Sequence, residues 1–472
     1  MKQKLLTILL AMLLALPATA RGFEYNDIYY CVLDEEAQTC ETHTNYKDAD
    51  YSGNLTIPSR VGDGNKIYTV IGIGDYSFCS DEITSINLPN TLQYIGTKSF
   101  ASCRKLKSVV IPESASSIGE RAFDGCSQIE SVYIPKSIES LGKFAFPRHT
   151  IITVDEENNH YCDQEGILFD KAKTILYSYP SIRSGSYDIP NTVKVIGDYA
   201  FSECDKLTTV SFPDSLNSIG IGAFNYSAIS EAIVPDSVTS LGEGAFTGCT
   251  KLALVSLPDN IVTIEGLTFY GCENLTEVEL PQSLATIESE AFYGCRALQS
   301  ISLPNTLTEI KGYAFGWCGS ITSITLPESL QRIRRDGFLG CSSLKYLFIN
   351  SPELIIDGNG FADCYKLTDI YNSAITPRKS AQNIFDSDIY NKATLHVREE
   401  SLSTFKNTIP WGLFNNIVSH DFSGFSDIEN DEDTIGEVYT ANGIRVGNST
   451  ENLAPGIYIV RRSNDVQKLL IK

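Results

Sequence analysis

Residues 309–331 read EIKGYAFGWCGSITSITLPESLQ, and this pattern returns along most of the chain. At its centre is a Phe that follows a small residue, with Ile or Leu five positions before it. The spacing between these Phe residues is 22 or 23, apart from one gap of 55. They are Phe78, Phe100, Phe123, Phe146, Phe201, Phe224, Phe246, Phe269, Phe292, Phe315, Phe338 and Phe361. A period of roughly 20 to 29 residues indicates a solenoid of stacked coils.

Each repeat supplies two apolar faces that a single coil cannot bury. After the Phe comes L-x-x-I-x-L-P, as in Leu298, Ile301, Leu303 and Pro304. The I-x-L alternation has period two, so it predicts a short strand with both apolar residues inward, ended by a Pro that cannot donate to a ladder. Stacking then buries a continuous core, with Phe on the side opposite the strand. The sequence therefore predicts about a dozen coils of 22–23 residues with parallel strands.

Nine cysteines lie three residues after a repeat Phe, and the two coils of 22 residues that begin at Phe78 and Phe224 lack one. The thiol thus belongs to one turn of the full-length coil. We expect it to be a small buried hydrophobe and weak donor that caps this turn. One Cys per coil, without C-x-x-C or paired His, does not converge on a metal.

Cys31 and Cys40 lie outside this series and flank a short polar stretch near the N-terminus. Two alternatives stay open for them, a disulfide across a hairpin and a pair of free thiols.

The chain has 472 residues, with 58 acidic and 37 basic side chains and a formal net charge of −21. Binding to phosphate backbones or to anionic lipid needs clustered Lys and Arg. We therefore expect no nucleic acid partner and no anionic membrane partner. The acidic surface is typical of a soluble chain.

Residues 1–20 have the features of a secretory signal peptide. Lys2 and Lys4 precede an apolar run from Leu5 to Leu16, and an A-x-A cleavage site ends at Ala20. The run is short for a membrane span, and no later segment approaches about 20 apolar residues. We expect no transmembrane segment, and a chain that is secreted or held on the outer surface of a bacterial cell.

The repeated I-x-x-x-A-F-x-x-C-x-x-L-x-x-I-x-L-P resembles the BspA-like leucine-rich repeat, which is common in surface proteins of Bacteroidetes and some protozoa. The likeness covers residues 71–372. It implies a leucine-rich-repeat solenoid in a surface or secreted binding protein, and several such proteins act as adhesins toward host proteins.

Three flanking stretches are similar to other parts of the same family. Residues 21–70, with IYYCVL and YSGNLTIP, look like its N-terminal β cap. Residues 147–195 resemble a hairpin insertion between repeats, and residues 373–425 look like the C-terminal cap. Arg398 stands where that cap usually has Pro.

The tail predicts a separate module. Residues 426–434 form an acidic linker around DIENDED. Residues 435–472 predict four short strands separated by turns at Asn442-Gly443 and Pro455-Gly456. This small all-β module resembles the C-terminal sorting domain of the type IX (Por) secretion system, which implies passage across an outer membrane. The alternative is a locally stabilising module without a sorting role.

No motif in the sequence indicates catalysis. The five His are dispersed, and no G-x-S-x-G, Walker A or H-E-x-x-H motif occurs. Asp155, Glu156, Glu157 and Asp163 match no EF-hand spacing, so a solvated loop is expected rather than calcium. We predict a chain that is not an enzyme and needs no cofactor.

The remaining candidate site is the outward side of the strands, which the core does not constrain. Its aromatic residues and central acids are the candidate contacts for a protein or glycan partner: Tyr133, Tyr346, Phe348, Tyr371, Glu277 and Glu279. We expect the cap after Asn372 to cover the aromatic group, the alternative being an exposed interface centre. A structural or self-associating surface component is the alternative function.

Overall fold

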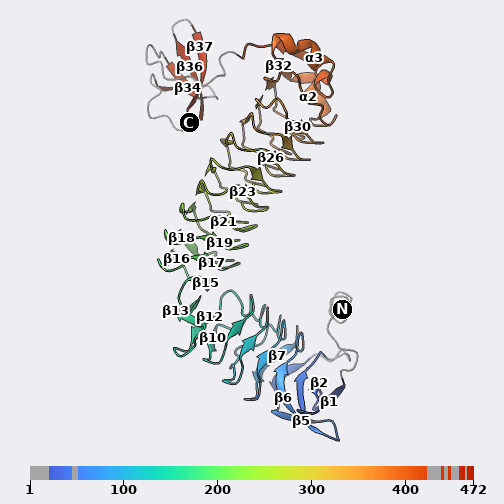
Figure 1. The fold of residues 1–472 in the computed structure, drawn as a ribbon, viewed down its shortest axis with the longest axis vertical. Helices are drawn as coiled ribbons and strands as arrows, with labels where there is room; N and C mark the ends of the chain where they lie inside the picture. Colours follow the sequence, from blue (N-terminus) through green and yellow to red (C-terminus); the bar gives the residue numbers. More distant parts are fainter. Residues whose placement is uncertain are drawn as a thin grey trace. The chain divides into compact units, whose positions relative to one another are not determined.

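The computed structural model describes residues 21–44 and 51–422, together with the strand backbones 437–440, 445–447, 456–462 and 465–471. The predicted signal peptide and acidic linker lie outside the described residues. The chain forms two compact units: unit 1 is Met1–Arg183 with Thr192–Cys204, and unit 2 is Ser184–Asn191 with Asp205–Lys472. Each unit is a stack of coils (Figure 1).

Unit 1 opens with a mixed sheet. Strands β1 (Gly22–Tyr25), β2 (Ile28–Asp34) and β3 (Thr39–Thr42) form an antiparallel meander. Strand β3 then pairs in parallel with β6 (Ile67–Ile73), which also pairs antiparallel with β5 (Arg60–Gly62). Tyr30 and Tyr68 are fully buried beneath this sheet, so it closes the end of the apolar core.

The disulfide considered for Cys31 and Cys40 is not formed, and both residues are free thiols. On the paired strands β2 and β3, Cys31 lies opposite Glu41, whereas Cys40 lies opposite Val32. Successive side chains of a strand point to opposite faces. The one-residue offset therefore places the two thiols on different faces of the sheet.

The predicted strands form the long-strand face of the coils. In unit 1, β7 (Glu82–Asn87) pairs in parallel with β4 (Ser52–Thr56), and β10 (Ser131–Ile134) with β12 (Ile151–Val154). Unit 2 continues the pattern with parallel pairs between neighbouring coils. These strands are β16 (Gly185–Asp188), β18 (Leu207–Ser211), β20 (Glu231–Ile233), β22 (Leu254–Ser256), β24 (Glu277–Glu279), β27 (Ser323–Leu326), β29 (Tyr346–Ile349) and β31 (Asp369–Asn372).

A second row of strands, only two residues each, runs where the Ile or Leu precedes the Phe. Its members pair in parallel within each unit. Unit 1 has β8 (Tyr94–Ile95), β9 (Ser117–Ile118), β11 (Ser140–Leu141) and β17 (Val195–Ile196). Unit 2 has β19 (Ser218–Ile219), β21 (Ser240–Leu241), β23 (Thr263–Ile264), β25 (Thr286–Ile287), β26 (Glu309–Ile310), β28 (Arg332–Ile333) and β30 (Ile355–Ile356). The sequence pattern did not predict this row as strand.

The repeat Phe side chains stack inside the coils. In unit 1, rings from Phe78 to Phe146 follow one another at 5.1–5.4 Å between centroids. In unit 2, rings from Phe224 to Phe361 do so at 4.9–5.7 Å. All but Phe146 are fully buried, and Phe146 is 7% exposed. The predicted solenoid of stacked coils with parallel strands is confirmed, and its turns number about 15.

The thiols form a ladder beside the Phe stack. In eight coils the Sγ donates to the carbonyl oxygen of the Phe one coil earlier, at 3.0–3.4 Å. Cys204, in the coil that follows the insertion, instead lies 3.8 Å from the carbonyl oxygen of Ser202. Burial raises the pKa of Cys249 to about 12, so its thiol stays protonated and can donate at neutral pH. The predicted small, buried thiol with a weak donor is confirmed, but the donor bonds to the preceding coil and not to its own turn.

The 55-residue gap holds an antiparallel meander in unit 1. Strands β13 (Tyr161–Gln164) and β14 (Ile167–Asp170) form a hairpin, and β14 pairs next with β15 (Ile175–Ser178). Strand β15 then pairs in parallel with β17, which returns the chain to the solenoid.

The C-terminal end of unit 2 adds helices to the coil. They are α2 (Ser387–Lys392), the 3₁₀ turn η1 (Glu399–Ser401), α3 (Leu402–Lys406) and η2 (Trp411–Leu413). Strands β32 (Thr394–Val397) and β33 (Asn416–Ser419) continue the long-strand face from β31. Beyond residue 436 the chain forms a four-stranded antiparallel sheet in the order β35 (Arg445–Gly447), β34 (Glu437–Thr440), β36 (Gly456–Arg462), β37 (Asp465–Ile471).

Candidate functional site

The six candidate contact residues all lie on long strands, but the structure does not gather them into one site. Tyr133 is on β10 in unit 1. The others are in unit 2, with Glu277 and Glu279 on β24, Tyr346 and Phe348 on β29, and Tyr371 on β31. The coil between β24 and β27 has no assigned long strand, so the acids and the aromatic residues belong to separate sheets.

Three rings line up across β29, β31 and β32, and a fourth, just after β33, packs edge-on against two of them. We call these four residues the aromatic stripe: Phe348, Tyr371, His396 and His420. Phe348, Tyr371 and His396 hold the same outward position on adjacent parallel strands. Phe348 and Tyr371 stack at 4.9 Å, and Tyr371 and His396 at 4.3 Å, with interplanar angles of 14° and 9°. His420 meets Tyr371 edge-on at 5.1 Å.

Charged groups border the stripe. The Nε2 of His396 lies 3.0 Å from Oδ1 of Asp369, the residue two positions before Tyr371 on β31. Lys345 places its ammonium 5.0 Å from the ring centre of Tyr346. Burial raises the pKa of Tyr371 above its ordinary value, so its hydroxyl stays protonated further into alkali. The stripe thus combines flat apolar rings with donors and acceptors at its edge.

The C-terminal cap covers the aromatic group in part, because His396 stacks on Tyr371 and His420 packs edge-on against the same ring. Strands β32 and β33 add to the same sheet, and the next outward position after His396 is Val418. Tyr346, Phe348 and Tyr371 are each half-buried.

Sequence reasoning missed His396 and His420, which were judged dispersed and out of register. The available signal was the segment TLHV (394–397), whose alternation matches DIYN (369–372) and places His396 level with Tyr371. Phe385 of this cap coil stacks on Phe361 at 5.7 Å between centroids. It follows Phe361 by 24 residues and comes after Ile384, not after a small residue, which hid that register.

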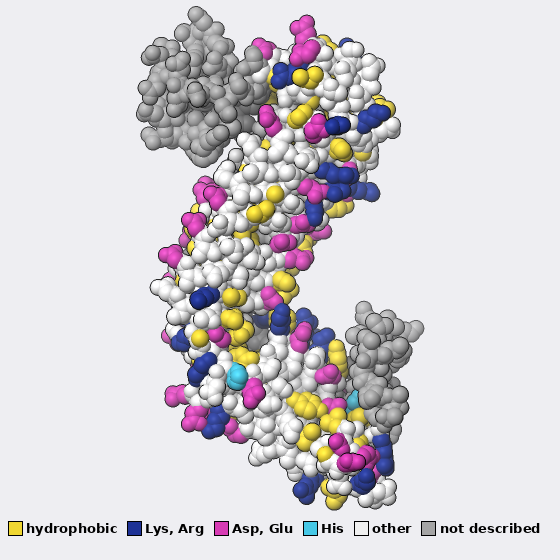
Figure 2. Space-filling view, viewed as in Figure 1, with side chains coloured by type: hydrophobic (Ala, Val, Ile, Leu, Met, Phe, Trp, Pro, Cys, Tyr) yellow, Lys and Arg dark blue, Asp and Glu magenta, His cyan; other side chains and the backbone are white. Residues whose placement is uncertain are grey.

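The acids in the middle of unit 2 form a smaller feature. Glu277 and Glu279 point outward from β24, and both are exposed. The Oγ of Ser256, on the adjacent strand β22, donates to Oε2 of Glu279 at 2.6 Å. On the face drawn in Figure 2, acidic side chains are scattered over the coils without a single large cluster.

Tyr133 borders a hollow in unit 1, next to the insertion. Its hydroxyl donates to Oδ2 of Asp155 at 2.6 Å, and this bond raises the pKa of Tyr133 to about 12. The hollow has a volume of about 900 Å³.

Over residues 21–44 and 51–422, no three His, Cys, Asp or Glu side chains gather as a metal ion would require. The buried thiols are poor ligands because burial raises the pKa of Cys272 and Cys295 well above the ordinary value. No helix in the described part of the chain is long and apolar enough to cross a membrane.

The BspA type leucine rich repeat region, in six copies, matches residues 71–164, 176–295 and 262–391. No curated protein matches the chain.

The solved structures that are similar to this one include the following three. A leucine-rich repeat protein from Eubacterium ventriosum ATCC 27560 has 25% identity and a TM-score of 0.54, over 68% of this chain and 95% of its own. A leucine rich cell surface protein from Faecalibacterium prausnitzii A2-165 has 25% identity and a TM-score of 0.47, over 75% and 94%. A leucine-rich repeat protein from Bacteroides ovatus ATCC 8483 has 30% identity and a TM-score of 0.41, over 69% and 94%.

Proposed function

Since the chain belongs to the BspA-type leucine-rich repeat family, we propose that it is a secreted or cell-surface binding protein, adhesin-like in use, that engages an extracellular protein through the aromatic stripe. The single observation that carries this proposal is the stacked row Phe348, Tyr371 and His396 on three adjacent strands.

Physical reasons favour this row as an interface centre. Rings that already stack on one another lose little conformational freedom when a partner covers them. Aromatic side chains, Tyr above all, are enriched among the residues that contribute most binding energy. A flat row with Asp369 and Lys345 at its edge suits a protein surface with complementary charges. We propose that the chain works by binding and is not an enzyme.

Export is the second part of the proposal. The apolar run from Leu5 to Leu16 and the A-x-A site at Ala18–Ala20 support removal of residues 1–20 as a signal peptide. The antiparallel order β35-β34-β36-β37 and the resemblance of residues 435–472 to a type IX sorting domain support a role of this module in surface delivery. Deleting residues 435–472 in the native cell and locating the product by fractionation tests that role.

The binding proposal is tested with residues 21–472 as bait. Crosslinking on intact host cells, followed by mass spectrometry, identifies the partner. Surface plasmon resonance then compares the wild-type chain with Phe348→Ala and Tyr371→Ala. We expect each variant to weaken binding about thirtyfold, which corresponds to about 2 kcal/mol for a residue at an interface centre.

Tyr226→Ala is the matched control, because Tyr226 is 59% exposed in the same unit and lies outside the stripe. If both stripe variants melt like wild type and bind the partner with unchanged affinity, the stripe is not the interface. Light scattering of the same samples tests the alternative function. If no host partner is found and the wild-type chain forms oligomers that dissociate in the stripe variants, the chain is a self-associating surface component instead.

A further inference from the structure

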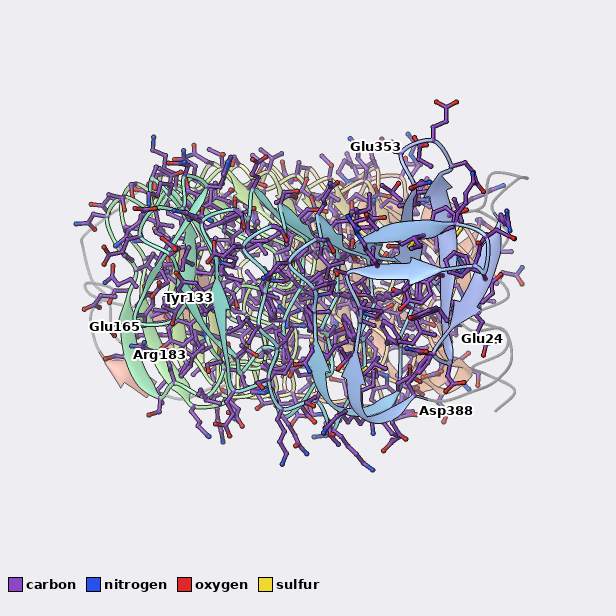
Figure 3. The ribbon with its side chains drawn as sticks, turned by 90° about the horizontal axis from the view of Figure 1, so that it is seen from below. Glu24, Tyr133, Glu165, Arg183, Glu353 and Asp388 are labelled. Atoms are coloured by element: carbon purple, nitrogen blue, oxygen red, sulfur yellow. The ribbon has the colours of Figure 1, made fainter. Side chains whose placement is uncertain are left out.

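The hollow beside Tyr133 is built by segments that the repeat alone does not provide. Strand β10 supplies Tyr133, and β12 with the turn after it supplies one wall. The hairpin β13–β14 and the residues that follow it supply the other wall. Figure 3 places Tyr133 on the same side of the coils as Glu165 and Arg183, whose 2.7 Å ion pair ties the tip of the hairpin to the segment after β15. The insertion therefore converts a flat strand face into a concave one of about 900 Å³.

The Tyr133 ring is held in place but not covered. Its hydroxyl is fixed by Asp155, whose other carboxylate oxygen accepts the N–H of Glu157 at 2.8 Å. The side chain nevertheless remains 49% exposed. Val110 occupies the equivalent outward position one coil earlier and is 80% exposed, so the apolar surface continues beyond the ring. An oriented ring with open surface offers a stacking platform at little entropic cost.

The hollow presents donors and acceptors together. Four carboxylates and two ammonium groups line it, a formal charge of −2. Both ammonium groups bond to neutral oxygens: Lys171 donates to the carbonyl oxygen of Glu156 at 2.9 Å, and Lys173 to Oε1 of Gln164 at 2.9 Å. An ammonium has three donors, so further donors remain at each lysine. Glu156 and Asp163 bring carboxylate acceptors to the same space.

We propose that this hollow binds a neutral oligosaccharide, with one sugar ring against Tyr133 and its hydroxyl groups bonded to the carboxylates and lysines. Sugar hydroxyls both donate and accept, so one ligand satisfies acidic and basic groups that lie side by side. A neutral ligand also avoids the repulsion that the carboxylates exert on an anionic sugar. The volume is within the usual range of about 300–1,000 Å³ for small-ligand sites.

A basic peptide fits these observations less well. Its cationic side chains favour the carboxylates, but Lys171 and Lys173 stand in the same hollow and repel them. The inference goes beyond the proposed function, since the hollow is in unit 1 and the stripe in unit 2, so either one can fail while the other stands.

The test uses residues 21–472 on an array of neutral and of sialylated or uronic-acid oligosaccharides, followed by calorimetry with the strongest neutral binder. We expect binding to neutral members, reduced at least tenfold in Tyr133→Ala and several-fold in Glu156→Gln. Tyr226→Ala and Glu139→Gln serve as matched controls, because each changes the same residue type at an exposed position outside the hollow. Both controls should bind like wild type.

Three results overturn the proposal: no neutral oligosaccharide binds at millimolar concentration, Tyr133→Ala binds as tightly as wild type, or a lysine-rich peptide alone binds in a Tyr133-dependent way. Thermal melting of each variant separates loss of the site from loss of the fold. Phe348→Ala on the same array separates this site from the stripe, because it should leave oligosaccharide binding unchanged.

Discussion

The Sγ of Cys295 donates to the carbonyl oxygen of Phe269, one coil earlier, at 3.2 Å. The same carbonyl accepts the backbone N–H of Cys272 at 3.1 Å, from its own coil. One oxygen therefore joins a turn within a coil to the thiol of the next coil. Repetition of this contact along the stack ties neighbouring coils together at the point where the Phe rings meet.

The first prediction concerns that thiol. Cys295→Ala removes one buried hydrogen bond and the packing of the sulfur, but leaves the Phe269 carbonyl with its bond from Cys272. We expect a loss of about 1–2 kcal/mol in the free energy of unfolding. Urea denaturation followed by circular dichroism measures it.

Cys295→Ser is the control for the donor, since Ser227 occupies the same turn in a coil without Cys. It should lose less than the Ala variant. Midpoints equal to wild type in both variants contradict a stabilising thiol ladder.

The second prediction concerns the Phe stack. Phe292 is fully buried between Phe269 and Phe315, with 5.1 Å between centroids on each side. Phe292→Ala opens a cavity that neighbouring coils cannot fill without breaking their own stacking, so we expect a loss of about 3–5 kcal/mol. Phe292→Leu keeps most of the volume and should lose clearly less. Equal urea midpoints for the two variants would show that the volume of the side chain at position 292 does not determine the stability of the stack.

The interior was predictable because the sequence repeats it. Phe spacing located the stacked rings, the I-x-L pattern located the long strands, and the missing Cys in the two short coils assigned the thiol to one turn. Each of these inferences required only that residues at the same position of successive repeats have the same surroundings in the fold. The row of two-residue strands escaped prediction because a pair such as Thr286–Ile287 is too short to show any periodicity.

The candidate site was less predictable because it forms where the repeat is interrupted. His396 joins the stripe from a cap coil whose Phe385 lies 24 residues after Phe361, outside the repeat spacing, and the hollow at Tyr133 needs the fold of the insertion. Cys31 and Cys40 show the same limit, since a one-residue register difference decides which face each thiol occupies. The spacing of residues along the sequence does not show which register two paired strands adopt.

The third prediction concerns close approach of coils at a glycine. A Cβ on Gly242 would lie 2.5 Å from the carbonyl carbon of Gly220 and from the backbone nitrogen of Ile221. Backbone atoms cannot move aside as a flexible side chain can, so Gly242→Ala should lose about 1–3 kcal/mol.

Gly266→Ala is its control, because the nearest atom there is the carbonyl oxygen of Ser289 at 3.3 Å. Thermal melting should place this variant much closer to wild type. A Gly266→Ala variant that melts as low as Gly242→Ala rules out contact between coils as the cause.

The last prediction is a loss of stability in alkali. Burial raises the pKa of Cys249 from its ordinary value of 9.0 to about 12. Between these values the unfolded chain has released the thiol proton while the folded chain still holds it, so deprotonation favours unfolding. The contribution of this thiol is complete below pH 9 and declines as the pH rises toward 12.

Because tyrosines also ionise in this range, the comparison must be with Cys249→Ala. The stability difference between wild type and this variant, from urea midpoints, should shrink by about 1.4 kcal/mol between pH 7 and pH 10. A difference that stays constant over that interval means that the Cys249 thiol keeps its ordinary pKa in the folded chain.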